Sequence, residues 1–361
     1  MKVRTVKHFS LHRIEDTELR VISDVESGVL PVVQVEERVI RGYIQQKLWP
    51  HREVTLFILQ DMQPIVRQLG PNTALPPGGA AALDTRPVVN IYDLANPDAC
   101  HVVVNKKAME KEGYWHDPMA MQGLLAHEHA HPLAENQTTR SSRSWQLHGT
   151  LAQATTEGQA GRALWTASRQ DKVQRLIAVL ADKLCLYAPR EIFANDLMIQ
   201  KGFGQALLHL DRGNVLSAGR SVEGRSVLQQ QLQADVARDD LTPQGADALL
   251  LIADLRGYLD LALEIAPFYR TGEHGAAKEL ETVLQTAVFP NLDPEVAVAY
   301  ADLCEQYRLL RPDLAPAEMQ VWGHGVLTVL ARALAQKGMA LHDEWIPGQG
   351  KLAAGQEGRT P

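Results

Sequence analysis

The stretch LLAHEHAHPLAEN (124–136) sets three histidines and a glutamate within five positions and places a proline directly after the last histidine. The residues before it, PMAMQGLLAHE, are good helix formers. Asp117 and Pro118 supply the residue types preferred at a helix N-cap and at the first helical position. The stretch therefore predicts an α-helix that begins at Pro118 and carries the histidines in its last turns.

Helical geometry separates these polar residues into two groups. Each residue of an α-helix turns by about 100°, so His127 and His131 share one face, with Cβ atoms about 5–6 Å apart. Glu128 points beside that face, whereas His129 points away from it. The helix thus selects His127, Glu128 and His131 as one chemical set.

This spacing is the HExxH motif, in which two histidines bind zinc and the glutamate acts as a general base. Pro132 follows directly and disfavours helical geometry at the residue before it. We therefore expect the helix to end or kink at His131 and the segment from Leu133 onward to continue as a loop.

Two other interpretations of the stretch remain open. Gly123, His129, His131 and Glu135 fit the first metal-binding motif of cupins, which requires the β-strands of a barrel. No Pro-x-Gly segment followed by a histidine supplies the second cupin motif downstream. A cluster of solvated or buried histidines without a metal is the other alternative.

A catalytic zinc ion takes three protein ligands and keeps one position open. Position 137, where a longer motif would supply a third histidine, is a glutamine, so the candidates are His148, Glu157 and Glu191. Glu191 is favoured because it falls on a predicted helix, in the first turn after Pro189. An acidic residue there also suits the helix dipole, so stabilisation of the helix is the alternative role. Asn195 or Asp196, about one turn later, could orient a ligand from outside the metal's own shell.

The rest of the chain divides into two parts by its pattern. The amino-terminal part predicts a helix over 36–49, strands over 54–61, 87–94 and 100–105, and a Gly/Pro-rich loop over 70–87. From residue 117 the pattern is almost wholly helical, with helices expected over 171–187, 190–211, 224–238, 245–266, 275–288, 294–310 and 315–337. The fold class is therefore α+β, mostly α, with domains expected over 1–215 and 216–342 and a polar, Gly-rich tail over 343–361.

The composition excludes several classes of protein. The net charge of −7 does not favour a broad nucleic-acid surface, and the N-terminus has charges where a signal peptide needs an apolar core. The most apolar helical stretch, 248–266, carries four charged residues and does not suit a membrane span. Three widely spaced cysteines form no CxxC pair. We expect a cytoplasmic protein that binds neither nucleic acid nor membrane, and the sequence does not indicate its oligomeric state.

Together, HExxH and the later stretch Glu191-x-x-Ala194-Asn195 resemble the gluzincin zinc metallopeptidases, such as the ImmA/IrrE-type regulators and other minimal gluzincins. The similarity covers roughly residues 34–212. It implies a zincin-like domain with a short β-sheet, in which Zn²⁺ is held by His127, His131 and Glu191 and Glu128 is the catalytic base. It also implies that the strand over 100–105 is the edge strand along which a peptide or protein substrate pairs.

The function expected from this resemblance is hydrolysis of peptide bonds by a zinc-activated water. The donor that stabilises the oxyanion is left open among Tyr187, Tyr269, Arg270 and His274. The main alternative is a non-proteolytic, zinc-stabilised sensor or interaction protein with a zincin-like fold, and hydrolysis of a substrate other than a peptide is a third possibility.

Overall fold

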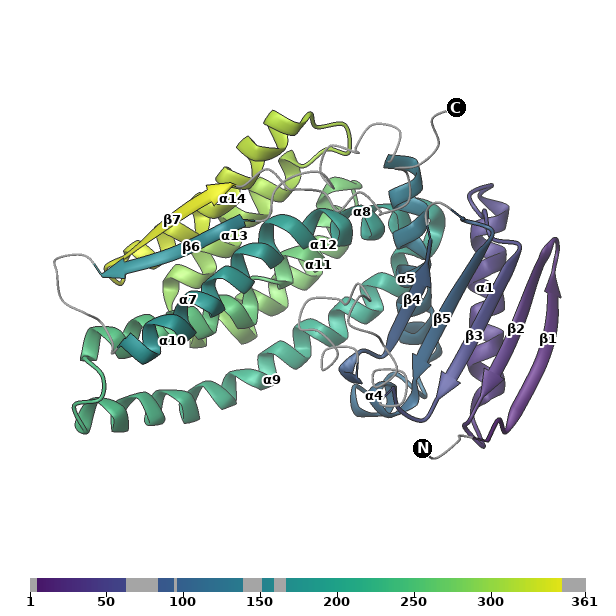
Figure 1. Cartoon of the computed structure of the whole chain (residues 1–361), viewed down its shortest axis with the longest axis horizontal. Helices are drawn as coiled ribbons and strands as arrows, with labels where there is room; N and C mark the ends of the chain where they lie inside the picture. Colours follow the sequence, from purple (N-terminus) through teal and green to yellow (C-terminus); the bar gives the residue numbers. More distant parts are fainter. Residues whose placement is uncertain (1–4, 63–83, 94–95, 139–150, 159–166, 346–361) are drawn as a thin grey trace, which may run out of the picture. The chain divides into compact units, whose positions relative to one another are not determined.

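A computed structural model describes residues 5–62, 84–93, 96–138, 151–158 and 167–345. The chain is α+β and mostly helical, and it forms two compact units (Figure 1). The first unit comprises residues 1–136 and 194–210, and the second comprises residues 137–193 and 211–361. The domain expected over 1–215 thus contains the whole first unit together with residues 137–193 and 211–215 of the second.

The first unit is built on a five-stranded mixed sheet with the order β1-β2-β3-β5-β4. Its strands are β1 (His8–Ile14), β2 (Thr17–Ser23), β3 (Glu53–Leu59), β4 (Val88–Tyr92) and β5 (Ala99–Asn105). β2, β3 and β5 run parallel to one another, and an antiparallel strand closes each edge. The strands predicted around 54–61, 87–94 and 100–105 are therefore present, whereas β1 and β2 were not predicted.

The expected edge strand was assigned wrongly. β5 lies inside the sheet, between β3 and β4, and β4 forms the edge. The error arises because order along the chain does not give order in a sheet. β4 precedes β5 in the chain, but β5 pairs in parallel with β3 and leaves its hairpin partner β4 on the outside.

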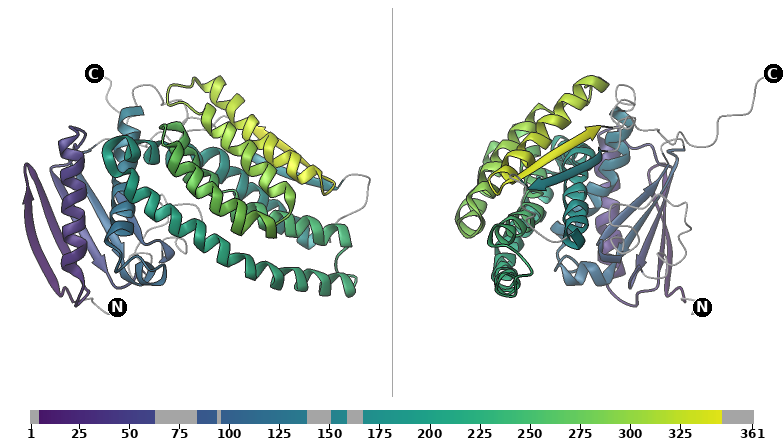
Figure 2. Two further views of the ribbon diagram at one scale, coloured as in Figure 1. Left: turned by 180° about the vertical axis from the view of Figure 1, so that it is seen from behind. Right: turned by 60° about the vertical axis from the view of Figure 1, so that its left-hand side comes forward.

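One face of this sheet is covered by α1 (Val29–Gln45) and α5 (Pro118–Thr138), as Figures 1 and 2 show. The Tyr43 hydroxyl of α1 donates a hydrogen bond of 2.8 Å to the Ala126 carbonyl of α5. Gly123 lets the backbone at Ala206 approach α5 closely, since a Cβ at position 123 would lie 2.8 Å from the Ala206 carbonyl oxygen. The core between sheet and helices is aliphatic and includes Leu19, Val21, Leu56, Ile58, Val102 and Val104.

The beginning of α5 confirms the predicted helix start. The Asp117 carboxylate accepts hydrogen bonds of 3.0 Å from the backbone N–H groups of Met119 and Ala120. This is the N-cap arrangement that satisfies donors left over at a helix start. A short helix, α4 (Lys106–Lys111), precedes it and is capped in the same way by Asn105.

The described part of the second unit is helical apart from one strand pair. Its helices are α7 (Ala167–Asp182), α10 (Pro243–Tyr258), α11 (Leu261–Arg270), α12 (His274–Val283), α13 (Pro294–Leu309) and α14 (Pro316–Ala335). β6 (Leu151–Gly158) and β7 (Met339–Trp345) pair antiparallel, which the sequence did not predict. Asp293 caps α13 as expected. The predicted helix over 245–266 is two helices, α10 and α11.

Two further helices cross the boundary between the units. α8 (Ala188–Met198) lies between π-helical turns at Lys183–Tyr187 and Ile199–Phe203, and α9 (Gly204–Ala237) follows as one long helix (Figure 2). The sequence predicted a break between 211 and 224 that α9 does not have. Among the described residues, no helix is both long and apolar enough to cross a membrane. Much of the Gly/Pro-rich loop over 70–87 and most of the tail over 343–361 lie outside the described residues.

Two neighbouring carboxyl groups inside the helical unit make its stability depend on pH. Burial raises the pKa of Glu264 to about 8, and burial together with the charge of Glu264 raises the pKa of Asp211. The native state therefore keeps a proton on Glu264 that the unfolded chain loses at about pH 4.5. Since the native state binds more protons in this window, the free energy of unfolding should fall as pH rises from 4.5 to 8.

We expect Glu264→Gln to stabilise the protein at pH 8, by about 1 kcal/mol or 2–4 °C in Tm. Glutamine stays neutral at every pH and can still accept the hydrogen bond that Asn214 donates to Glu264. Thermal unfolding of wild type and variant from pH 4.5 to 8 measures the effect. The exposed Glu223→Gln is the control and should follow the wild type. A variant less stable than wild type at pH 8 would contradict the expectation.

Candidate metal centre

The residues singled out by the HExxH motif lie on the carboxyl-terminal half of α5. His127 and His131 face each other with ring centroids 4.6 Å apart and ring planes at 80°. His131 is buried at 4% exposure, while His127 and Glu128 are half-buried. One buried and one half-buried imidazole suit a metal site that must keep one position open.

Glu191 on α8 completes the group. The candidate ligand atoms of His127, His131 and Glu191 all lie within 4.8 Å of one another. Two imidazoles and one carboxylate are a donor set that Zn²⁺ takes in catalytic sites. Among the other candidates for third ligand, His148 lies outside the described residues, and Glu157 lies in β6 paired with Ala340.

The same helix orients one of the histidines. Asn195, one turn after Glu191 on α8, has its Oδ1 2.8 Å from Nδ1 of His127. The amide oxygen can only accept, so Nδ1 carries the proton and Nε2 keeps the lone pair that binds a metal. Of the two residues considered for this role, the structure pairs Asn195 with the histidine.

Loss of this hydrogen bond should weaken zinc binding. We expect Asn195→Ala to lower zinc affinity by about 10- to 100-fold, the usual cost of removing a partner that orients a ligand. A competition titration with a zinc-binding dye measures the affinity. Asn195→Asp keeps an acceptor in the same place and should lose less. Equal affinities for Asn195→Ala and wild type would contradict this role.

His129 lies outside the metal group and is bound elsewhere. Its side chain is fully buried, and its Nε2 lies 2.8 Å from Glu36 Oε1 on α1. Burial alone would lower the pKa of His129, but the Glu36 carboxylate outweighs it and, with a smaller contribution from Cys100, raises the pKa to about 10. His129 is therefore protonated near neutral pH and has no lone pair for a metal.

This pairing also rules out the cupin interpretation. The stretch from Gly123 to Glu135 is helical rather than part of a barrel, and His129 would have to be a ligand. Glu135, the remaining cupin candidate, accepts a hydrogen bond of 2.8 Å from the Tyr92 hydroxyl on β4.

We expected α5 to end or kink at His131, and it does not end there. The helix continues through Pro132 to Thr138. A proline inside a helix leaves the carbonyl four residues earlier without its usual donor, here the carbonyl of Glu128. The Asn90 side chain on β4 donates a hydrogen bond of 3.1 Å to that carbonyl through Nδ2. Tertiary structure thus supplies a donor that the local sequence lacks.

Asn90 is the residue that sequence reasoning missed. Its backbone N–H also donates a hydrogen bond of 3.1 Å to Glu128 Oε2. The available signal was a single polar residue in the apolar strand VVNIY, since asparagine is depleted in strands. That signal does not by itself name a partner.

Three of the expected oxyanion donors have contacts within the helical unit. The Tyr269 hydroxyl bonds Glu281, and its ring contacts His274. Arg270 donates to the backbone carbonyls of Tyr307 and Leu310. Tyr187, the fourth, is partly exposed in the π-helical turn before α8. These contacts do not identify any of the four residues as the oxyanion donor.

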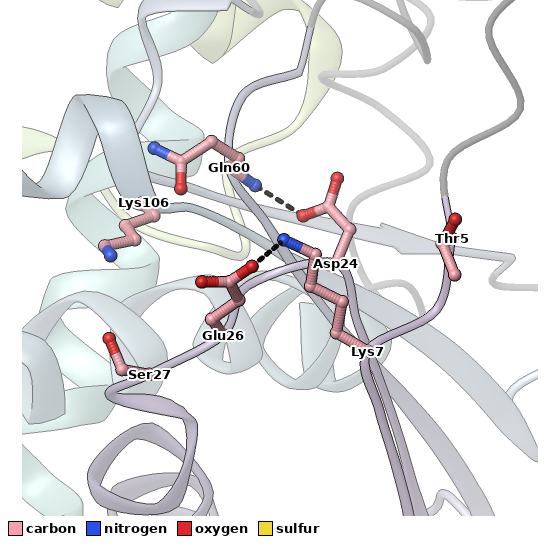
Figure 3. Close-up of a pocket in the computed structure, with 7 residues that line it drawn as sticks. All are labelled: Thr5, Lys7, Asp24, Glu26, Ser27, Gln60 and Lys106. Atoms are coloured by element: carbon pink, nitrogen blue, oxygen red, sulfur yellow. Dashed lines mark hydrogen bonds and ion pairs between the residues drawn. The ribbon is translucent and has the colours of Figure 1, made fainter.

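A polar hollow in the first unit is separate from this group (Figure 3). It lies where β2 and β3 end, and one of its charged groups, Lys106, pairs with Glu110 at 3.6 Å. Lys7 donates to Glu26, and the Gln60 backbone N–H donates to Asp24, both at 2.7 Å. None of the residues lining it belongs to the group of His127, His131 and Glu191.

Comparison of the chain with family models, with curated proteins and with solved structures gives no match in any of the three.

Proposed function

We propose that this protein is a zinc-dependent metallopeptidase of the gluzincin type. The observation that carries the proposal is the grouping of His127, His131 and Glu191 with Glu128 next to the first ligand on α5. Of the residues in this group, His127 also has a partner that fixes its tautomer for metal binding. The protein should act on a peptide or protein substrate with Zn²⁺ as cofactor.

The donor set fits the metal that the motif implies. When bound, Zn²⁺ lowers the pKa of a coordinated water to about 7 and polarises the carbonyl of the scissile bond. His127, His131 and Glu191 hold the ion, and His127 is oriented by Asn195. This leaves Glu128 as the group that moves protons.

Glu128 performs the acid–base work in this proposal. Its carboxylate accepts a proton from the attacking water as the C–O bond forms, and it donates that proton to the leaving amine as the C–N bond breaks. Glu128 thus returns to its starting state after each reaction, and one water is consumed for each peptide bond cleaved. An extended substrate would lie along the edge strand β4, whose Asn90 contacts Glu128.

The test is cleavage of a mixed peptide library by the purified protein with and without a chelator. We expect cleavage that stops on metal removal and returns on addition of Zn²⁺. Cleavage that survives complete metal removal would contradict the proposal. Bound zinc without cleavage of any peptide would favour the zinc-stabilised sensor, or hydrolysis of another kind of substrate, over a peptidase.

A further inference from the structure

Pro132 and Asn90 together determine which donor bonds the Glu128 carbonyl. Pro132 lies inside α5 and has no N–H, so it cannot donate to the Glu128 carbonyl one turn earlier. Asn90 donates to that oxygen from the neighbouring strand at 3.1 Å. Because of the proline, the Glu128 carbonyl oxygen is left to accept a hydrogen bond from β4.

The second contact of Asn90 reaches the other end of the same residue. Its backbone N–H donates to Glu128 Oε2, also at 3.1 Å. Asn90 is 8% exposed and lies at the centre of β4, in register with Val102 of β5. Both the main chain and the carboxylate of Glu128 are therefore bonded to one buried residue that the sheet holds in place.

We propose that Asn90 is a positioning residue for Glu128. Pro132 leaves the Glu128 carbonyl without its helix donor, and the Asn90 side chain donates a hydrogen bond to that carbonyl. The catalytic consequence rests on the proposed function. A glutamate side chain that is free to rotate loses conformational entropy when it is fixed, and a base held in advance does not incur that loss during the reaction. Aspartate could not replace Asn90, because a carboxylate has no donor for the carbonyl.

A double-mutant cycle tests the first half of this proposal without any need for activity. Asn90→Ala should lower Tm by about 2–4 °C, because it leaves the Glu128 carbonyl without this donor. In a Pro132→Ala background the new backbone N–H at position 132 can serve that carbonyl, so the same substitution should lower Tm by less than half as much. Equal losses in both backgrounds would overturn the pairing of Asn90 with Pro132.

Kinetics test the second half. Asn90→Ala should lower kcat about 10-fold while KM and zinc content stay at wild-type values, since none of the metal ligands is touched. The double variant Asn90→Ala/Pro132→Ala should keep this loss, because residue 132 restores a helix hydrogen bond but not the connection to β4. The control is Leu11→Ala, which truncates an exposed side chain on β1, at the opposite edge of the sheet, and should keep kcat near wild type. An unchanged kcat in Asn90→Ala, or full recovery in the double variant, would overturn the positioning role.

The proposal remains testable if the protein cleaves no peptide. In that case the proposed function fails, and amide hydrogen exchange at Asn90 takes the place of kinetics. Exchange should be faster in Glu128→Ala than in wild type, because the acceptor of the Asn90 N–H is gone. Unchanged exchange would show that the carboxylate is not held by β4.

Discussion

Glu128→Gln should abolish peptide hydrolysis and leave the metal in place. Glutamine has nearly the same shape as glutamate, and its Oε1 can still accept a hydrogen bond from the Asn90 N–H, but it cannot take a proton from water at neutral pH. Loss of general base catalysis is worth about 10²- to 10⁴-fold in kcat. Zinc content should remain at wild-type level, because Glu128 is not one of the three grouped ligands.

Glu135→Gln is the matched control for this variant. It makes the same chemical change two turns further along α5, at a carboxylate that accepts a hydrogen bond from the Tyr92 hydroxyl and is not one of the three grouped ligands. We expect its kcat to stay within a few-fold of wild type. Turnover by Glu128→Gln at the rate of this control would remove Glu128 from the role of base.

Glu191→Ala should lower zinc affinity more than any change outside the metal group. It removes one of three ligands, so the loss should exceed the 10- to 100-fold that follows removal of an orienting partner such as Asn195. Competition titration against a zinc-binding dye gives the affinity of each variant on one scale. Hydrolysis should fall with zinc occupancy and recover in part at high zinc concentration.

Glu157→Ala is the corresponding control, because Glu157 was the rival candidate for third ligand. Its backbone lies in β6, paired with Ala340 of β7. We expect this variant to bind zinc as wild type does. If Glu157→Ala loses zinc and Glu191→Ala retains it, the ligand set proposed here is wrong.

Local rules predicted those parts of the fold that depend on nearby residues. The cap at Asp117 and the cap at Asp293 depend on a side chain two or three residues from its partner, and both are as expected. The shared face of His127 and His131 follows from helical rotation alone. Such features need no knowledge of the rest of the chain.

Features that depend on distant residues were missed or predicted wrongly. The continuation of α5 past Pro132 involves Asn90, which lies 38 residues before Glu128. The position of β4 at the edge of the sheet depends on the pairing of β5 with β3. The pair β6 and β7 joins segments from opposite ends of the second unit. No periodicity in a short window carries this information.

The candidate metal site shows both kinds of dependence. The pair of histidines could be predicted from one turn of helix, and Glu191 was expected from the resemblance of its stretch to the gluzincin motif. The contact of His129 with Glu36 could not, since the two residues are 93 positions apart. From the sequence alone, the three histidines differ only in the face of the helix on which each one lies.

The most direct test of the metal site is the zinc content of the purified protein, measured by elemental analysis after equilibration with Zn²⁺ and removal of unbound metal. We expect one zinc ion per chain in the wild type, and none in a variant that combines His131→Ala with Glu191→Ala. A wild-type protein that retains no zinc, or a double variant that retains as much as the wild type, would contradict this expectation.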